Sequence, residues 1–520
     1  MKQALSALLL LLSSGYAFGV DGDRADYLRY LAQSQGEYDA YLQAQNRQFS
    51  RWLQRQWQEF AAFRGEKHYL QQKLPVSALV PPEGSDALHG ADRELQPQLA
   101  SAASERTAQQ ETGSLYSKVE SIATTLQDSD PATQLPPLTQ QQGWRVVEIP
   151  FFGSLLTIPY VAEAEAQTLA LPLNHHQLGG LWQRQSRLSY LPTLQRLQQI
   201  RTLLQLNDWG YLLLVNRLSE ALYPRAVDAR GYAWFLLNQS GLRTKLGYRG
   251  DDLYLLTAMA SRLYDLPFYE VDKQRYYNIS LLDSKGEAYP QRLRIYEGDF
   301  ALATRHFDLG LERLPQLRHD RLLQADLDFR YAGERYRIHT RHSQRLLDFL
   351  ATYPRVDFDL LFSAEMGSPT VEEVRQQLSS IVAGMTEEAA VSLLLRFVQT
   401  AFNYQRDEEQ FGEERYLFAD QTLIAAGSDC EDRAVLFSYL VRHILGLEVV
   451  GIHYPGHMAT AVHFSSEVEG RSLIYQGKRY VICDPTYLYA AVGREIPKLQ
   501  TEERRIIPQP APVTADIEAM

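Results

Sequence analysis

Two stretches of this chain carry the strongest indications of its fold and chemistry: GSDCEDRAVLFSYLVRHILGLEVVGIHYPGHMATAVHF, residues 427–464, and YVICDPTY, residues 480–487. Behind Cys430 the apolar residues recur at helical spacing until Gly446 interrupts them, which predicts a helix with Cys430 in its first turn. The unpaired N–H groups and the positive dipole end of a helix start stabilise a thiolate. The sequence therefore predicts a thiol at Cys430 that is partly activated by its position.

Three strands are predicted after this helix, at 447–454, 458–464 and 479–483. His457 stands between a Pro-Gly turn and the second strand, and Asp484 directly follows the third strand. An aspartate at that place can hold an imidazole in the tautomer that accepts a thiol proton. Cys430, His457 and Asp484 are therefore a candidate nucleophile, its base and the carboxylate that orients the base.

The motifs GSDC, GHM and DPT in these stretches resemble those of the transglutaminase-like superfamily, whose core has a papain-like layout. The DCED run and GHMATAV are more similar to bacterial periplasmic transglutaminase-like cysteine proteinases than to the usual members, and the resemblance covers residues 386–492. It implies an enzyme acting on amide bonds through Cys430, His457 and Asp484. The tryptophan of the usual HAW motif is absent, because Met458 and Ala459 follow the histidine, so the resemblance does not indicate the acyl acceptor. Peptidase activity is favoured over crosslinking because the motifs are more similar to those of the periplasmic proteinases.

Other residues of the same region compete for these roles. Three further histidines lie nearby, His443, His453 and His463. Cys483 is the only other cysteine, and two cysteines in an oxidising compartment can form a disulfide. Successive strand side chains point to opposite faces, so Cys483 faces away if Asp484 faces His457. A free Cys430 is therefore expected, and a disulfide is the alternative.

Two carboxylates, Asp429 and Glu431, flank the cysteine. Carboxylates at these positions suit an N-cap and a first helical turn, where they interact with the helix dipole. They are also calcium ligands, and the resembling proteinases bind calcium beside the catalytic cysteine. Asp429 and Glu431 are therefore a possible calcium site, although the thiol chemistry itself requires no cofactor.

The N-terminus, residues 1–19, has Lys2, a short apolar run and a small-x-small end. This pattern predicts a cleavable signal peptide and hence a periplasmic or secreted protein. No later stretch is long and apolar enough for a transmembrane segment. The net charge of −11 argues against nucleic acid as a partner, because phosphate contact requires a basic face.

Residues 20–73 carry aromatic and apolar side chains near helical spacing, from Tyr27 to Phe60. They predict one long amphipathic helix, which either packs on a domain or self-associates. Residues 74–142, rich in Pro, Gln and Ser, predict a flexible linker with at most a short helix, and residues 501–520 a flexible tail.

Residues 143–285 begin with a predicted β hairpin around Phe152-Gly153-Ser154 and continue with helices. The segment 229–280 then repeats the order helix, Gly-Leu, strand of the region around Cys430. This match places Asp252 opposite His457 and contains no cysteine. Residues 143–285 are therefore interpreted as containing a degenerate transglutaminase-like domain, with chance recurrence of a common pattern as the alternative.

Residues 286–365 alternate polar and apolar side chains and predict a β-rich module between the copies, in which His339 and His342 form part of a solvated basic face. Residues 366–500 form the expected catalytic domain. The chain is therefore predicted to be an α+β protein with a papain-like C-terminal domain, acting on a protein or peptide in the cell envelope. The competing prediction is a non-catalytic periplasmic scaffold that binds its partner through papain-like modules.

Overall fold

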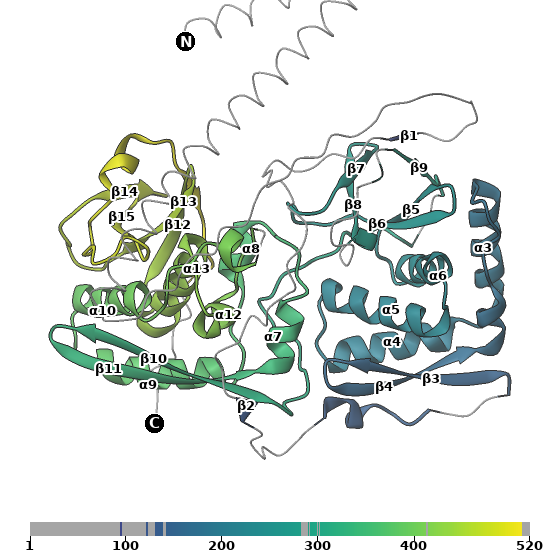
Figure 1. The fold of residues 1–520 in the computed structure, drawn as a ribbon, viewed down its shortest axis with the longest axis horizontal. Coiled ribbons are helices and arrows are strands. Elements are labelled where there is room, and N and C mark those ends of the chain that lie inside the picture. Colours follow the sequence, from purple (N-terminus) through teal and green to yellow (C-terminus); the bar gives the residue numbers. More distant parts are fainter. Residues whose placement is uncertain are drawn as a thin grey trace, which may run out of the picture.

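The computed structural model describes residues 130–138, 142–281, 290–411 except 291, 299 and 301, and 414–511, together with strands β1 (Glu94–Leu95) and β2 (Ser121–Ile122). The predicted signal peptide, the N-terminal amphipathic helix and the end of the predicted tail lie outside these residues. The fold mixes α and β structure, as predicted, and Figure 1 shows two units side by side. No helix of the described ranges is long and apolar enough to cross a bilayer.

The first unit, residues 142–308, places helices between a hairpin and a sheet (Figure 1). The hairpin consists of β3 (Trp144–Phe151) and β4 (Ser154–Val161). The helices are α3 (His175–Arg187), α4 (Leu191–Leu203), α5 (Asp208–Leu222) and α6 (Ala226–Gln239). The sheet contains β5 (Thr244–Arg249), β6 (Asp252–Thr257), β7 (Phe268–Val271), β8 (Gln274–Asn278) and β9 (Leu293–Ile295).

The second unit, residues 322–511, repeats this layering. Its hairpin consists of β10 (Leu322–Tyr331) and β11 (Glu334–Ser343). Its helices are α7 (Gln344–Leu350), α8 (Phe358–Ser363), α9 (Thr370–Val382), α10 (Glu387–Thr400), α11 (Asp407–Gln410), α12 (Ala419–Ile424) and α13 (Cys430–Leu440), which continues as a π-helical turn at Val441–Leu445. Its sheet contains β12 (Glu448–Tyr454), β13 (His457–His463), β14 (Ser472–Tyr475), β15 (Lys478–Cys483) and β16 (Arg505–Ile507).

The two sheets have the same strand order. The first runs β1-β9-β5-β6-β8-β7 and the second β16-β12-β13-β15-β14, so five strands correspond and β1 is an additional edge strand of the first sheet. All neighbouring strands are antiparallel. In each unit the preceding helix ends at a glycine with positive φ, Gly241 at 84° and Gly446 at 65°. Both central hairpins have two-residue turns, so Asp252 and His457 occupy the same position at the start of the second strand.

The hairpins also correspond, because in each a helix covers the free edge of the second strand. On α4, Thr193 and Arg196 donate to the β4 carbonyl oxygens of Pro159 and Thr157. On α9, the side-chain carboxylate of Glu373 and the side-chain amide oxygen of Gln377 accept the β11 N–H groups of residues 341 and 339. Free edges expose unpaired backbone groups, so covering them prevents unwanted strand pairing.

Two predictions about the strands need correction. The strands of residues 286–365 do not form one module: β9 joins the first sheet, and the β10–β11 hairpin packs on α9 and α10 of the second unit. Polar and apolar alternation identifies a strand, but it does not identify the strand's partner. Within the predicted linker, the described segments β1 and β2 are strands, which pair with the edge strands β9 and β10.

Helix α13 is central to the second unit. Ten of its eleven residues are buried, all except Glu431, and such a helix packs on every side. It contacts the sheet strands β12 and β13 and the helices α10 and α12. Its first turn is therefore held rigidly beside the start of β13.

Candidate active site

His457 and Asp484 are brought together by neighbouring strands. His457 is the first residue of β13 and Asp484 follows the last residue of β15, its partner in the sheet. Their Nε2 and Oδ2 atoms lie 2.8 Å apart, and both residues are buried. Because Nε2 is held by Asp484, Nδ1 is the ring nitrogen that can exchange a proton with a nucleophile.

The Asp484 carboxylate is oriented by its own loop. Its other oxygen, Oδ1, accepts the backbone N–H groups of Thr486 and Tyr487, each at 3.0 Å. Gln399 of α10 supports this loop, because its Nε2 lies within 3.1 Å of the carbonyl oxygens of residues 484, 487 and 490. No sequence pattern indicated this role for Gln399, since it depends on a contact across 85 residues.

Cys430 begins α13 and is 9% exposed. The backbone N–H of Met458, the residue after His457, lies near enough to the thiol to act against the rise of its pKa. The thiol also lies 2.7 Å, measured from Sγ, from Oε2 of Glu431. Both cysteines are free thiols, and Cys483 is buried in the core on β15. The structure thus places the sulfur beside the start of β13, next to the residue that carries the imidazole.

The thiol is less acidic than its position at a helix start predicted. Burial raises the pKa of Cys430 well above its usual value, and the neighbouring carboxylates Glu431 and Asp429 raise it further. A helix N-terminus carries only about half a positive charge. Desolvation and two nearby carboxylates oppose it and are stronger in this structure. The prediction of a thiol activated by helix position alone is therefore wrong for the protein without a bound cation.

A group of buried carboxylates lies behind the thiol. Ligand oxygens of Asp407, Asp429 and Asp432 are all within 4.8 Å of one another. Burial raises the pKa of each carboxyl, as does the charge of the other acids, and that of Asp432 reaches about 7. The Oδ1 atoms of Asp407 and Asp429 are buried without a hydrogen-bond partner. Unsatisfied carboxylate oxygens that face one another fit a hard cation such as calcium.

Only one of the two predicted calcium ligands belongs to this group. Asp429 does, whereas Glu431 directs its carboxylate to the Cys430 thiol. Asp432 stands in the same DCED run, so the sequence contained a signal for it. Asp407 lies on α11, more than twenty residues earlier, and only the acidic composition of that stretch pointed to it.

The buried acids predict an unusual pH dependence of stability. Asp432 has a folded pKa of about 7 against an ordinary value of 3.8. Between these values the folded state binds more protons than the unfolded state, so the stabilisation present below pH 3.8 is lost as pH rises to about 7. With chelator present, we expect the free energy of unfolding to fall from pH 5.5 to 7.5, by up to about 1.4 kcal/mol per pH unit for each such group.

Urea unfolding at these two pH values measures the effect. Asp407→Asn should reduce the slope, because one of the mutually repelling acids is removed. Glu388→Gln, at an exposed position on α10, should not. A free energy of unfolding that rises with pH over this range would show that the folded-state pKa values of the three carboxyls are not raised.

Arg433 braces the site from inside α13. Its side chain is fully buried and donates to Ser428 Oγ and to the carbonyl oxygens of Phe402 and Gln399. The guanidinium also lies over the ring of Tyr404, 5.6 Å from its centroid, and burial lowers its pKa to about 10. These contacts tie the Cys430 loop to the end of α10.

The remaining candidates lie elsewhere. His443 stacks on Tyr439, His453 packs on Phe358, and His463 bonds the Arg479 carbonyl oxygen. His339 pairs with Asp326 at the surface, whereas His342 is fully buried against Thr340, so the predicted solvated face holds for His339 only.

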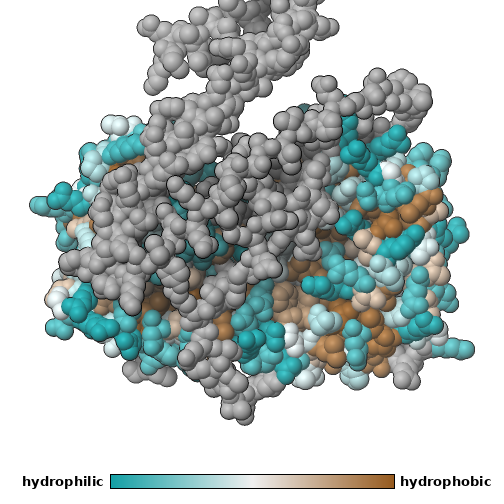
Figure 2. Space-filling view, in the orientation of Figure 1, coloured by the Kyte–Doolittle hydropathy of each residue, from teal (hydrophilic) through white to brown (hydrophobic). Residues whose placement is uncertain are grey.

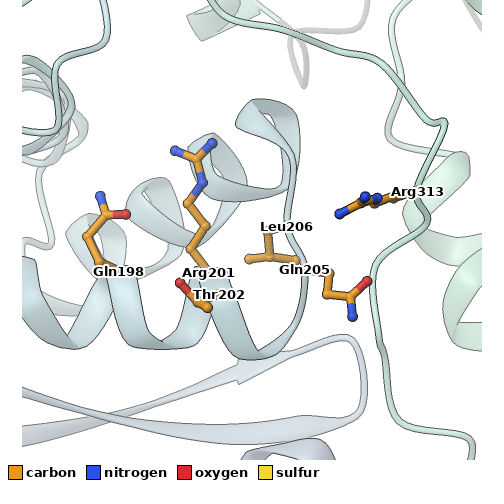
Figure 3. Close-up of a pocket in the computed structure, with 6 residues that line it drawn as sticks. All are labelled: Gln198, Arg201, Thr202, Gln205, Leu206 and Arg313. Atoms are coloured by element: carbon orange, nitrogen blue, oxygen red, sulfur yellow. The ribbon is translucent and has the colours of Figure 1, made fainter.

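An open cavity of about 330 Å³ lies between the C-terminal part of α4 and the segment that carries Arg313, away from these residues. Figure 3 shows its lining, which consists of Gln198, Arg201, Thr202, Gln205, Leu206 and Arg313. Arg201 is engaged with Asp208 at 2.6 Å and lies over the ring of Tyr211. The cavity contains none of the residues that the sequence predicted for catalysis.

Comparison with known proteins adds no family assignment, since no family model, curated protein or solved structure matches this chain. The functional argument therefore depends on the residues and their geometry.

Proposed function

We propose that this chain is an exported thiol enzyme of the transglutaminase-like type, which cleaves amide bonds as a cysteine peptidase in the cell envelope. The observation that carries the proposal is the buried hydrogen bond between His457 and Asp484, formed beside the helix start that carries Cys430. The order of these residues along the chain and the motifs around them agree with that superfamily. Export to the periplasm rests on the signal peptide predicted at residues 1–19.

The proposed chemistry begins with transfer of the Cys430 proton to Nδ1 of His457. The thiolate attacks the amide carbonyl carbon, and the backbone N–H of Cys430 stabilises the developing oxyanion. The imidazolium then gives its proton to the leaving amine, and a water deprotonated by His457 hydrolyses the acyl-enzyme. Asp484 keeps the ring oriented and stabilises its charged form.

Calcium is proposed as a regulator of this site rather than a participant. Asp407, Asp429 and Asp432 would hold it through carboxylate oxygens. A bound divalent cation supplies positive charge that offsets the acids beside the thiol. Without the metal, burial, the Glu431 carboxylate and Asp429 together raise the pKa of Cys430 and keep it protonated.

The competing function is a non-catalytic scaffold, and the first unit supports it. Its sheet has the strand order of the second, which supports the interpretation of residues 143–285 as a degenerate copy. At the positions of the triad it carries Ala226 at the helix start, Asp252 at the strand start and Ile279 after β8. A chain that retains this arrangement without its nucleophile can use such a unit for binding.

Thiol labelling tests the two functions. With calcium present, iodoacetamide should modify Cys430 stoichiometrically at about pH 6. His457→Ala should slow the reaction by about 100-fold, because an unpaired thiol is almost wholly protonated at this pH. Mass spectrometry of the labelled peptide gives the rate.

His463→Ala is the matched control, since this histidine lies at the other end of β13 and should leave the rate unchanged. Equal rates in the wild type and His457→Ala, with the pH dependence of an ordinary thiol, would favour the scaffold.

A further inference from the structure

The β3–β4 hairpin of the first unit turns an apolar face to solvent. Alternation along the strands places four cross-strand pairs on this outer face: Trp144 with Val161, Val146 with Pro159, Glu148 with Thr157, and Pro150 with Leu155. Val146 is 52% exposed and Leu155 is 55% exposed. Figure 2 shows hydrophobic residues over this part of the first unit, at the lower right of the view.

The β10–β11 hairpin of the second unit provides an internal comparison with β3–β4. Its strands are of similar length, its inner face packs on helices, and a helix covers the edge of its second strand. Beyond the buried Leu322–Ser343 pair at its end, its outer face carries polar side chains: Gln324, Asp326, Asp328, Arg330, Arg335, Arg337, His339 and Arg341. Cross-strand ion pairs satisfy this face, as between Arg337 and Asp328. Topology therefore does not require an apolar outer face, and the apolar residues of β3–β4 need another explanation.

We propose that the outer face of β3–β4 is the docking surface for the N-terminal amphipathic segment of this same chain, centred on Phe49 to Phe60. The apolar residues of this segment are Phe49, Trp52, Leu53, Trp57 and Phe60, which fall on one side of a helix. Packing buries aromatic side chains that would otherwise remain in water. Of the two roles expected for this helix, the proposal corresponds to packing on a domain.

The length of the N-terminal segment agrees with the length of the outer face. As a helix, Phe49 to Phe60 extends over about 17 Å, at 1.5 Å per residue. The outer face from Trp144 to Pro150 extends over about 20 Å, at 3.4 Å per residue. One helix laid along the hairpin therefore covers the face, and the hairpin becomes the middle of three layers, with α4 and α5 on its other side.

The path of the chain also favours this unit. The first described point after the segment is β1 at Glu94, which pairs with β9 in the first unit's sheet. The 34 residues from Phe60 to Glu94 reach about 110 Å when extended. This is several times the radius of gyration of about 15 Å expected for a unit of this size. The chain between Phe60 and Glu94 therefore ends on the unit whose hairpin has the apolar outer face.

Hydrogen exchange of the full-length mature protein tests the proposal. In the wild type, amides of residues 49–60 should be protected. The double variant Val146→Lys/Leu155→Lys should increase their exchange rates at least 10-fold, since charges on the face oppose docking. Both positions are exposed, so the variant should fold, and protection of α13 in the same experiment checks this.

Arg330→Glu, on the corresponding face of the second hairpin, is the matched control and should leave residues 49–60 protected. Light scattering accompanies each measurement. An unprotected segment in the wild type overturns the proposal. So does a wild-type dimer that becomes monomeric in the double variant, because the face then binds a second copy.

Discussion

Arg433→Met is expected to lower the free energy of unfolding by about 3–5 kcal/mol, the range for breaking a buried charge network by removing one partner. The substitution fills similar volume, but it leaves Ser428 Oγ and two carbonyl oxygens without their donor. It also removes a cation beside the buried acids, since Asp429 and Asp432 act to raise the Arg433 pKa. Urea unfolding followed by circular dichroism at pH 7 measures the change.

Arg433→Lys should recover only part of the loss, because a single ammonium cannot replace a planar guanidinium that bonds three acceptors and lies over Tyr404. The control is Arg217→Met on α5, where the side chain is 65% exposed and pairs with Glu220. That change should cost less than about 0.5 kcal/mol. An Arg433→Met protein as stable as the control would show that the guanidinium does not brace this loop.

Local features of the catalytic region could be predicted because each has a local cause. Helical spacing of apolar residues and Gly446 gave α13 with Cys430 at its first position. The Pro-Gly turn fixed the register of β12 and β13, so His457 begins its strand. The position of Asp484 after β15 placed its carboxylate at the same end of the sheet, where it bonds His457.

Features that depend on the whole fold could not be predicted in this way. Gln399 supports the Asp484 loop from a helix that no motif connects to it. Asp407 reaches Asp429 and Asp432 only through the packing of α11 near the start of α13. The raised thiol pKa follows from burial together with the carboxylates of Glu431 and Asp429, so the helix dipole gave the wrong direction. Strand partners of β9 and β10 likewise depend on long-range contacts.

Calcium is expected to raise the rate of Cys430 alkylation at pH 7 at least 10-fold over the chelator-treated protein. Glu431 and Asp429 both raise the thiol pKa, and a cation among Asp407, Asp429 and Asp432 opposes that effect. Each pKa unit removed increases the thiolate fraction about tenfold while the pKa remains above the pH. Stopped-flow alkylation with iodoacetamide, with calcium or with chelator, measures the two rates.

The double variant Asp407→Asn/Asp429→Asn should abolish the calcium effect, because it removes the carboxylates whose Oδ1 atoms lack partners. Its rate with chelator should exceed that of the wild type, since one of the charges that raise the thiol pKa is gone. Asp326→Asn, a surface carboxylate paired with His339, should retain the full response. A wild-type rate that calcium leaves unchanged, with the thiol still accessible to iodoacetamide, would rule out cation control and leave Cys430 regulated by burial and Glu431 alone.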